Sequence, residues 1–168
     1  MRTSITVDPN RVTAHIDPNI YGQFISRRRG VADGGLHAPE HPDADAHGLR
    51  KTVVEAIAAS APPVLRWPGG CTGTSYDWRE GVGPQDQRER TIDAHFGYDV
   101  SNDFGTAKFV QFCRQIGAEP HLNLSTGLGS LRDALEWLEY CNFTTPSKWE
   151  TCAASMGKTS RSTCVTGK

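Results

Sequence analysis

Hydrophobic positions along the chain recur with two spacings, one typical of helices and one typical of short buried strands. Leu49, Val53, Ala56 and Ile57 recur at helical spacing, which predicts a helix with one apolar face. The prolines at positions 62 and 63 end this helix, because proline cannot donate a backbone hydrogen bond and restrains the residue before it.

Two more helices are predicted further along the chain. The apolar positions of the first are Phe109, Phe112, Cys113 and Ile116. Gly117 follows, at the position where glycine commonly ends a helix. Ser130 and Asp133 have the spacing of a capping box, which opens the other helix. The expected inner face of that helix consists of Leu131, Leu135 and Leu138.

Apolar runs between these helices predict strands over residues 1–7, 20–25, 64–67 and 119–124. The thirty or so residues after Gly70 show no clear period, and their aromatic content indicates a long, ordered, functional loop. Strands that alternate with helices imply an α/β fold with a parallel sheet. The alternation alone does not distinguish a barrel from a doubly wound sheet, although no glycine-rich nucleotide motif is present to favour the latter.

Composition narrows the possible partners. The 168 residues suffice for one domain, and 18 basic against 19 acidic side chains give a net charge of −1. We therefore expect neither a nucleic acid nor a membrane as partner, and we interpret the arginines at 27–29 as a solvated loop. No apolar stretch is long enough for a membrane span. The five cysteines are odd in number and lack CxxC spacing, which favours a reducing, cytoplasmic location.

The polar, Pro/Gly-rich stretch before the first helix contains three histidines. His37, His41 and His47 lie among Asp43 and Asp45, so metal binding is conceivable. A surface loop is the favoured interpretation because nothing in the pattern fixes ligand geometry. We predict neither a metal nor a cofactor.

Several segments together resemble α-L-arabinofuranosidases of glycoside hydrolase family 51, over residues 13–149. They are Ile20-Tyr21-Gly22-Gln23-Phe24-Ile25, Leu65-Arg66-Trp67-Pro68-Gly69-Gly70-Cys71, the motif from Tyr76 to Pro84, and Glu139-Tyr140-Cys141-Asn142. The resemblance implies a partial TIM (β/α)8 barrel in which residues 13–149 supply about the first three βα units. It also implies that residues 1–12 give one strand to a β-sandwich formed by an absent C-terminal part.

The reaction implied by the resemblance is retaining hydrolysis of terminal, non-reducing α-L-arabinofuranosyl residues in arabinan and arabinoxylan oligosaccharides. Two carboxylates about 5 Å apart perform it. In such enzymes one follows the fourth strand in a Gly-Asn-Glu context and the other follows the seventh, and this chain contains neither. We therefore expect no hydrolysis by this chain. The alternatives are a carbohydrate-binding remnant, or another barrel glycosidase such as a β-xylosidase. Full-length family members are expected to form homo-oligomers, commonly hexamers.

The resemblance also assigns part of a substrate pocket. Arg66 matches an arginine that approaches the nucleophile, where it would keep that carboxylate ionised; an ordinary strand ion pair is the alternative. Gly69 and Gly70 would let the backbone pass close to the sugar, although a plain turn needs the same glycines. The remaining candidates are Cys71 as a sugar contact or, equally, a packing residue, Phe96 as an apolar wall, and Trp78, which could equally be core. Relatives continue after the first barrel strand with a Glu-His-Leu-Gly-type sequence, whereas this chain has Ser26-Arg27-Arg28-Arg29.

Residues 150–168 depart from the family pattern. They contain no Leu, Ile, Phe or Tyr, which predicts a disordered tail. A sharper hypothesis is a change of reading frame after Trp149. Synonymous codons for the tail can be chosen so that the shifted frame encodes a sequence resembling the one that precedes the Gly-Asn-Glu motif in relatives. The gene sequence would test this hypothesis directly.

Overall fold

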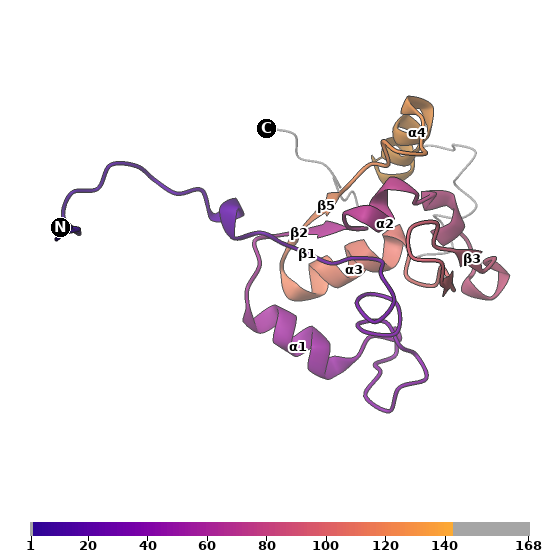
Figure 1. The fold of residues 1–168 in the computed structure, drawn as a ribbon. Helices are drawn as coiled ribbons and strands as arrows, with labels where there is room; N and C mark the ends of the chain where they lie inside the picture. The colour runs from indigo at the N-terminus through magenta and orange to yellow at the C-terminus, as the bar shows by residue number, and fades with distance from the viewer. Residues whose placement is uncertain (1, 143–168) are drawn as a thin grey trace.

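The structure is a computed structural model that describes residues 2–142. Its centre is a three-stranded parallel sheet made of β1 (Gln23–Phe24), β2 (Val64–Trp67) and β5 (Glu119–Leu122), with β2 in the middle. Helix α1 (Lys51–Ala59) connects β1 to β2, α3 (Thr106–Ile116) precedes β5, and α4 (Leu131–Asn142) follows it (Figure 1). This order confirms the predicted alternation and the α/β class with a parallel sheet.

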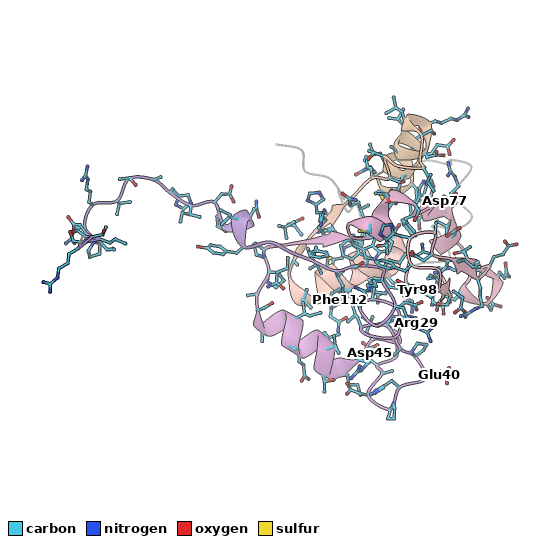
Figure 2. The ribbon with its side chains drawn as sticks, in the orientation of Figure 1. Arg29, Glu40, Asp45, Asp77, Tyr98 and Phe112 are labelled. Atoms are coloured by element: carbon cyan, nitrogen blue, oxygen red, sulfur yellow. The ribbon has the colours of Figure 1, made fainter. Side chains whose placement is uncertain are left out.

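Helix α3 covers one face of the sheet and supplies much of the core. Its apolar face buries Phe109, Val110, Phe112 and Cys113, and Phe112 points into the interior of the molecule (Figure 2). The helix ends as predicted, because Gly117 adopts a left-handed conformation at φ 75° that favours glycine. The helix therefore begins and ends where the sequence pattern indicates, within a few residues.

Aromatic side chains dominate the core beneath the sheet. Trp67 is fully buried and stacks on Phe109 with ring centroids 5.4 Å apart. Tyr76 and Trp137 meet the same indole ring edge-on, at 5.0 and 6.4 Å. Burying a large apolar side chain contributes roughly 1.5–3 kcal/mol. This cluster therefore joins β2, the segment that follows it, and α4 into one packed unit.

The predicted inner face of α4 is wrong. The buried positions are Trp137, Tyr140 and Cys141, whereas Leu131 is 79% exposed and Leu135 is 53% exposed. Trp137 offers more apolar area than any leucine of the helix and stacks on another tryptophan. That stacking turns the aromatic face of the helix inward and the leucine face outward.

Two predicted strands also differ from the structure. Residues 2–7 form no strand and stay exposed, and Figure 1 shows this N-terminal arm extending away from the rest of the molecule. A strand needs a neighbouring strand for its backbone hydrogen bonds, and the described residues offer none there. The run at 20–25 yields only β1, because a 3-10 helix, η1 (Pro18–Tyr21), takes its first part. The Asp17 side chain starts that turn by accepting a hydrogen bond from the Asn19 amide, at 2.8 Å.

The long segment between β2 and α3 is ordered, as predicted, and contains short elements. These are α2 (Cys71–Thr74), η2 (Trp78–Gly81), η3 (Gln85–Gln87) and an antiparallel hairpin of β3 (Thr91–Ile92) with β4 (Asp99–Val100). The predictions for residues 150–168 lie outside the described residues. The assignment of residues 1–12 to a β-sandwich and of 13–149 to a barrel stays a prediction.

Candidate functional site

The carboxyl ends of the three parallel strands meet at one edge of the sheet, which we call the rim. Ser26 follows β1, the Pro68-Gly69-Gly70 turn follows β2, and Asn123 follows β5. The Ser26 hydroxyl lies 3.2 Å from the Thr72 hydroxyl, and the Asn123 amide donates to the Gly69 carbonyl at 3.1 Å. Ligands of parallel α/β folds bind outside the carboxyl ends of strands. The rim is therefore the candidate ligand site.

The two candidate glycines both lie on the rim, in different environments. Gly69 has φ 120°, and a Cβ atom there would lie 2.8 Å from the Ser26 hydroxyl oxygen. Glycine is therefore required for the turn itself. Gly70 is exposed, and a Cβ atom there would meet nothing within 4 Å. Its backbone borders open space, as a close approach by a ligand would need.

Cys71 begins α2 directly after these glycines and carries an exposed, free thiol. Its carbonyl accepts a hydrogen bond from the Thr74 hydroxyl at 2.6 Å, which closes the short helix. The structure thus brings Gly69, Gly70 and Cys71 together beside Ser26. These four residues share the rim.

Arg66 is the second-last residue of β2, just before the strand reaches the rim. It is in register with Phe24 on one side and His121 on the other, so all three side chains share one face of the sheet. The Arg66 guanidinium lies 5.2 Å from the centre of the Phe24 ring. Among residues 2–142 it makes no ion pair, so the alternative of a strand arginine paired with an acid has no support in this part of the chain.

Phe96 lies at the turn of the β3–β4 hairpin and is 42% exposed. The Asp93 carboxylate fixes this turn by accepting hydrogen bonds from the amides of His95 and Phe96, at 3.0 and 2.9 Å. The Phe96 ring stacks on Tyr98 with centroids 5.9 Å apart. Part of the Phe96 ring is therefore accessible, and its role as an apolar wall beside the sugar stays a prediction.

Trp78 differs from the exposed candidates Cys71 and Phe96 because its side chain is buried. It is 2% exposed, stacks on Trp137 at 6.3 Å with nearly parallel rings, and donates its indole hydrogen to the Asp133 carbonyl at 3.1 Å. These contacts are those of a core residue, which is the role that the sequence left open beside ligand contact.

The interpretation of the three consecutive arginines as a solvated loop is wrong for Arg27, which is 5% exposed. Its guanidinium donates to the Asn102 side-chain carbonyl, lies 3.4 Å from the Glu80 carboxylate, and stands 4.6 Å over the Tyr76 ring. Burial raises the pKa of Glu80, and the nearby Arg27 charge works against that rise. Sequence reasoning missed this network because Glu80 and Asn102, which bond to the Arg27 guanidinium, lie more than fifty positions away along the chain.

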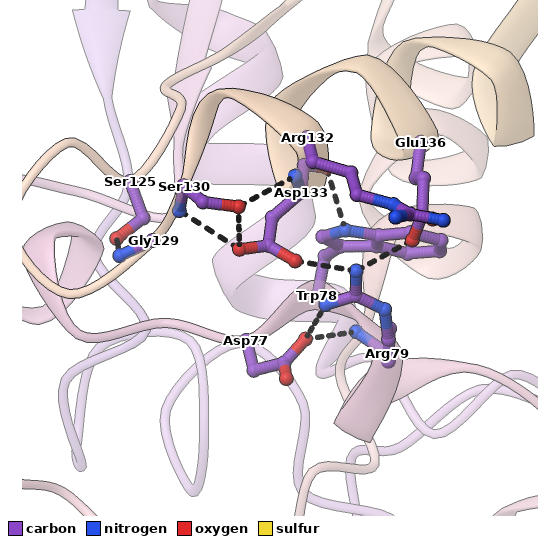
Figure 3. Close-up of polar contacts among 9 residues, drawn as sticks. All are labelled: Asp77, Trp78, Arg79, Ser125, Gly129, Ser130, Arg132, Asp133 and Glu136. Atoms are coloured by element: carbon purple, nitrogen blue, oxygen red, sulfur yellow. Dashed lines mark hydrogen bonds and ion pairs between the residues drawn. The ribbon is translucent and has the colours of Figure 1, made fainter.

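A second network, also missed from sequence, fastens η2 to α4. Arg79 donates to Asp133 and Glu136 at 2.6 Å each and to Asp77 at 3.1 Å (Figure 3). The predicted capping box is present here, because Ser130 and Asp133 exchange hydrogen bonds. Those bonds from Ser130, followed by the one from Arg79, lower the pKa of Asp133. The network borders a cavity of about 250 Å³, whose lining includes Ser75, Ser125, Leu128 and Trp137.

The histidine-rich stretch does not gather metal ligands. Within residues 2–142, no three His, Cys, Asp or Glu side chains come together as a metal-binding group. His37 is instead buried, with its Nε2 atom 2.8 Å from the Lys108 ammonium. No helix in this part of the chain is long and apolar enough to cross a membrane.

Fold and rim together define an α/β protein with its candidate ligand site at the carboxyl ends of a parallel sheet. Residues 56–160 match the family model described as the alpha-L-arabinofuranosidase 1 domain. That match covers more than half of the chain, which therefore belongs to the alpha-L-arabinofuranosidase family, within glycoside hydrolase family 51.

Individual relatives agree with this assignment. The chain is 40% identical to alpha-L-arabinofuranosidase C of Emericella nidulans over 83% of its own length and 28% of the relative's. It is 32% identical to an intracellular exo-alpha-(1->5)-L-arabinofuranosidase of Halalkalibacterium halodurans, over 94% and 31% of the two lengths. A thermostable GH51 alpha-L-arabinofuranosidase from Thermotoga petrophila superposes with a TM-score of 0.82 at 39% identity, over 90% of this chain and 31% of that one. The 168 residues thus span less than a third of the relatives they match.

Proposed function

We propose that this chain forms the first three βα units of the (β/α)8 barrel of a retaining, exo-acting α-L-arabinofuranosidase. Its substrates would be the terminal α-L-arabinofuranosyl residues of arabinan and arabinoxylan oligosaccharides. The observation that supports this most directly is the rim, where Ser26, Gly69, Gly70 and Cys71 meet at the carboxyl end of the sheet. Phe96 stands exposed on the hairpin of the long segment between β2 and α3.

Arg66 would act on a catalytic carboxylate supplied by later strands of the barrel. Its guanidinium has no ion-pair partner among the described residues and faces the side of the sheet that would become the barrel interior. A carboxylate brought there by later strands would be held ionised by this positive charge. We propose that the catalytic glutamates lie on such strands and that the 168 residues alone do not hydrolyse substrate.

Ser26 distinguishes this chain from the family pattern, which has glutamate at the corresponding position. A serine hydroxyl cannot act as a two-oxygen acceptor, so sugar hydroxyls lose an acceptor at the end of β1. This loss weakens the case for sugar binding at the end of β1. Binding without hydrolysis is the second candidate function, and the aromatic-rich segment between β2 and α3 is the feature that favours it. A cytoplasmic location and a homo-oligomeric full-length enzyme, commonly a hexamer in the family, complete the proposal.

A chimera tests the proposed function. Residues 1–142 of this chain would be joined to the part of the Thermotoga petrophila enzyme that follows the corresponding position. We expect hydrolysis of 4-nitrophenyl α-L-arabinofuranoside in preference to 4-nitrophenyl β-D-xyloside. Arg66→Gln should lower kcat/KM at least about a hundredfold, because an ion pair to the nucleophile would be lost.

The matched control is Arg114→Gln, which removes an exposed arginine on α3, away from the rim. A folded chimera with no arabinofuranosidase activity, or with a preference for the xyloside, would contradict the proposal. The 168-residue chain assayed in parallel should show no turnover above background.

A further inference from the structure

The three arginines after β1 attach this strand end to the β3–β4 hairpin, each in a different way. Arg27 is buried and bonds to Asn102 at the base of the hairpin. The Arg28 guanidinium lies 4.9 Å from the centre of the Phe96 ring. The Arg29 amide donates to the Tyr98 hydroxyl at 2.9 Å, and Arg29 and Tyr98 lie close together in Figure 2.

The three arginines differ in whether a nearby carboxylate offsets their charge. The Glu80 carboxylate offsets that of Arg27. Arg28 and Arg29 are exposed, and neither makes an ion pair with any residue from 2 to 142. Asp99, the acid that Arg29 influences electrostatically, is already paired with Arg90. The segment after β1 therefore carries, beside the hairpin, two positive charges that form no ion pair with a described carboxylate.

Arg28 is also tied to the rim. Its amide donates to the Ser26 hydroxyl at 3.2 Å, and that hydroxyl contacts Thr72 at the same distance. Arg28 therefore connects the rim, through its backbone amide, to the partly exposed Phe96 ring, through its guanidinium, and we call this region the Arg28 surface. Its donors suit a ligand with acceptor oxygens, and its ring suits an apolar sugar face.

We propose that Arg28 and Phe96 form a subsite for a carboxylate-bearing sugar, a uronic acid unit within an acidic oligosaccharide. The planar guanidinium matches a carboxylate with two parallel hydrogen bonds, while the exposed part of the Phe96 ring takes the C–H face of the same sugar. The inference rests on the proposed function and refines it, because it selects arabinofuranosyl oligosaccharides that carry an acidic unit.

Calorimetric titration of the 168-residue chain with two matched ligands tests the proposal. One ligand is a xylo-oligosaccharide bearing glucuronic acid and arabinofuranose. The other is the same compound after reduction of the carboxyl group to an alcohol. We expect the acidic ligand to bind about fivefold more tightly, as for an exposed ion pair. This advantage should shrink at high salt because exposed charges are screened.

Variants test whether Arg28 and Phe96 cause the preference for the acidic ligand. Arg28→Gln should remove the preference for the acidic ligand over the reduced one, and Arg114→Gln should leave both affinities unchanged. Phe96→Leu should weaken both ligands. Inorganic phosphate and free glucuronate are titrated separately, as simple anions without the oligosaccharide. Phosphate that binds as tightly as the acidic oligosaccharide would show a simple anion site and overturn the proposal.

Two other results separate this inference from the proposed function. Equal affinities for the acidic and reduced ligands, unaffected by Arg28→Gln, would overturn the inference and leave the proposed function standing. Absence of binding by either ligand, with the circular dichroism spectrum showing a folded chain, would count against both.

Discussion

Burial, followed by the charge of Lys108, has the largest effect on the protonation state of His37. The side chain is 2% exposed, and its Nε2 atom faces the Lys108 ammonium at 2.8 Å. Burial, followed by the Lys108 charge, lowers its pKa from 6.5 to about 4. The neutral imidazole accepts the hydrogen bond from Lys108, which also donates to the His47 carbonyl. Together these bonds attach the loop around residues 30–50 to α3.

This arrangement predicts a loss of stability in mild acid. Because the folded-state pKa of His37 is lower than its unfolded value, its contribution is complete above about pH 6.5 and declines as the pH falls toward 4. Thermal melts across that window should show a falling Tm. In the His37→Gln variant the amide oxygen can still accept from Lys108 but does not titrate, so its Tm should fall less over the same pH range. Identical pH profiles for the two proteins would contradict the assignment to His37.

Residues differ in how well sequence reveals them, according to the range of their interactions. Gly117 was predicted as the end of a helix because its left-handed conformation follows from local chain geometry. Arg27 was missed because Glu80 and Asn102 become its neighbours only when the chain folds. The site candidates Gly69, Gly70 and Cys71 are consecutive in the chain and lie together on the rim. That they contact the sugar stays a prediction.

At the scale of elements, helices follow from periodicity but their orientation does not. The spacing of apolar residues predicted α1, α3 and α4, and the structure contains all three. The leucine positions of α4 gave the wrong inner face, since Trp137 and Tyr140 find aromatic partners outside the helix. Short strands are harder still, because β1 depends on pairing with β2 more than on its own residues.

The capping box of α4 provides a test at this scale. Replacing Ser130 by alanine removes the hydroxyl that accepts from the Asp133 amide and donates to its carboxylate. We expect the free energy of unfolding to fall by about 0.5–2 kcal/mol, measured by urea denaturation. Ser4→Ala in the exposed N-terminal arm is the control and should change nothing. Equal stability of the two variants would show that the cap contributes little.

At the scale of the whole molecule, residues 2–142 cover the sheet on one side only. Leu65 and Trp67 point into the core, while Phe24, on the opposite face beside Arg66, is 60% exposed. The outer edges of β1 and β5 also lack partner strands among the described residues. The alternation of elements predicted this parallel sheet, but closure into a barrel needs more strands than the three that residues 2–142 supply to it, so it stays a prediction.

Such a sheet should make the chain associate with itself. Unpaired edges are templates for pairing between chains, and exposed apolar faces favour association. Size-exclusion chromatography at rising concentration should show a shift from monomer to larger species. Phe24→Lys, which places charge on the open face, should reduce this shift. A monomer that persists at all concentrations and melts in one sharp transition would count against the prediction.

The central place of β2 carries a consequence for how the chain acquires its structure. Among the strands of this sheet, each outer strand is the one that comes directly before or directly after β2 along the chain, so the sheet can assemble in chain order. During synthesis the first pair could assemble while the third strand is still inside the ribosome, and every later unit would add to an edge already in place.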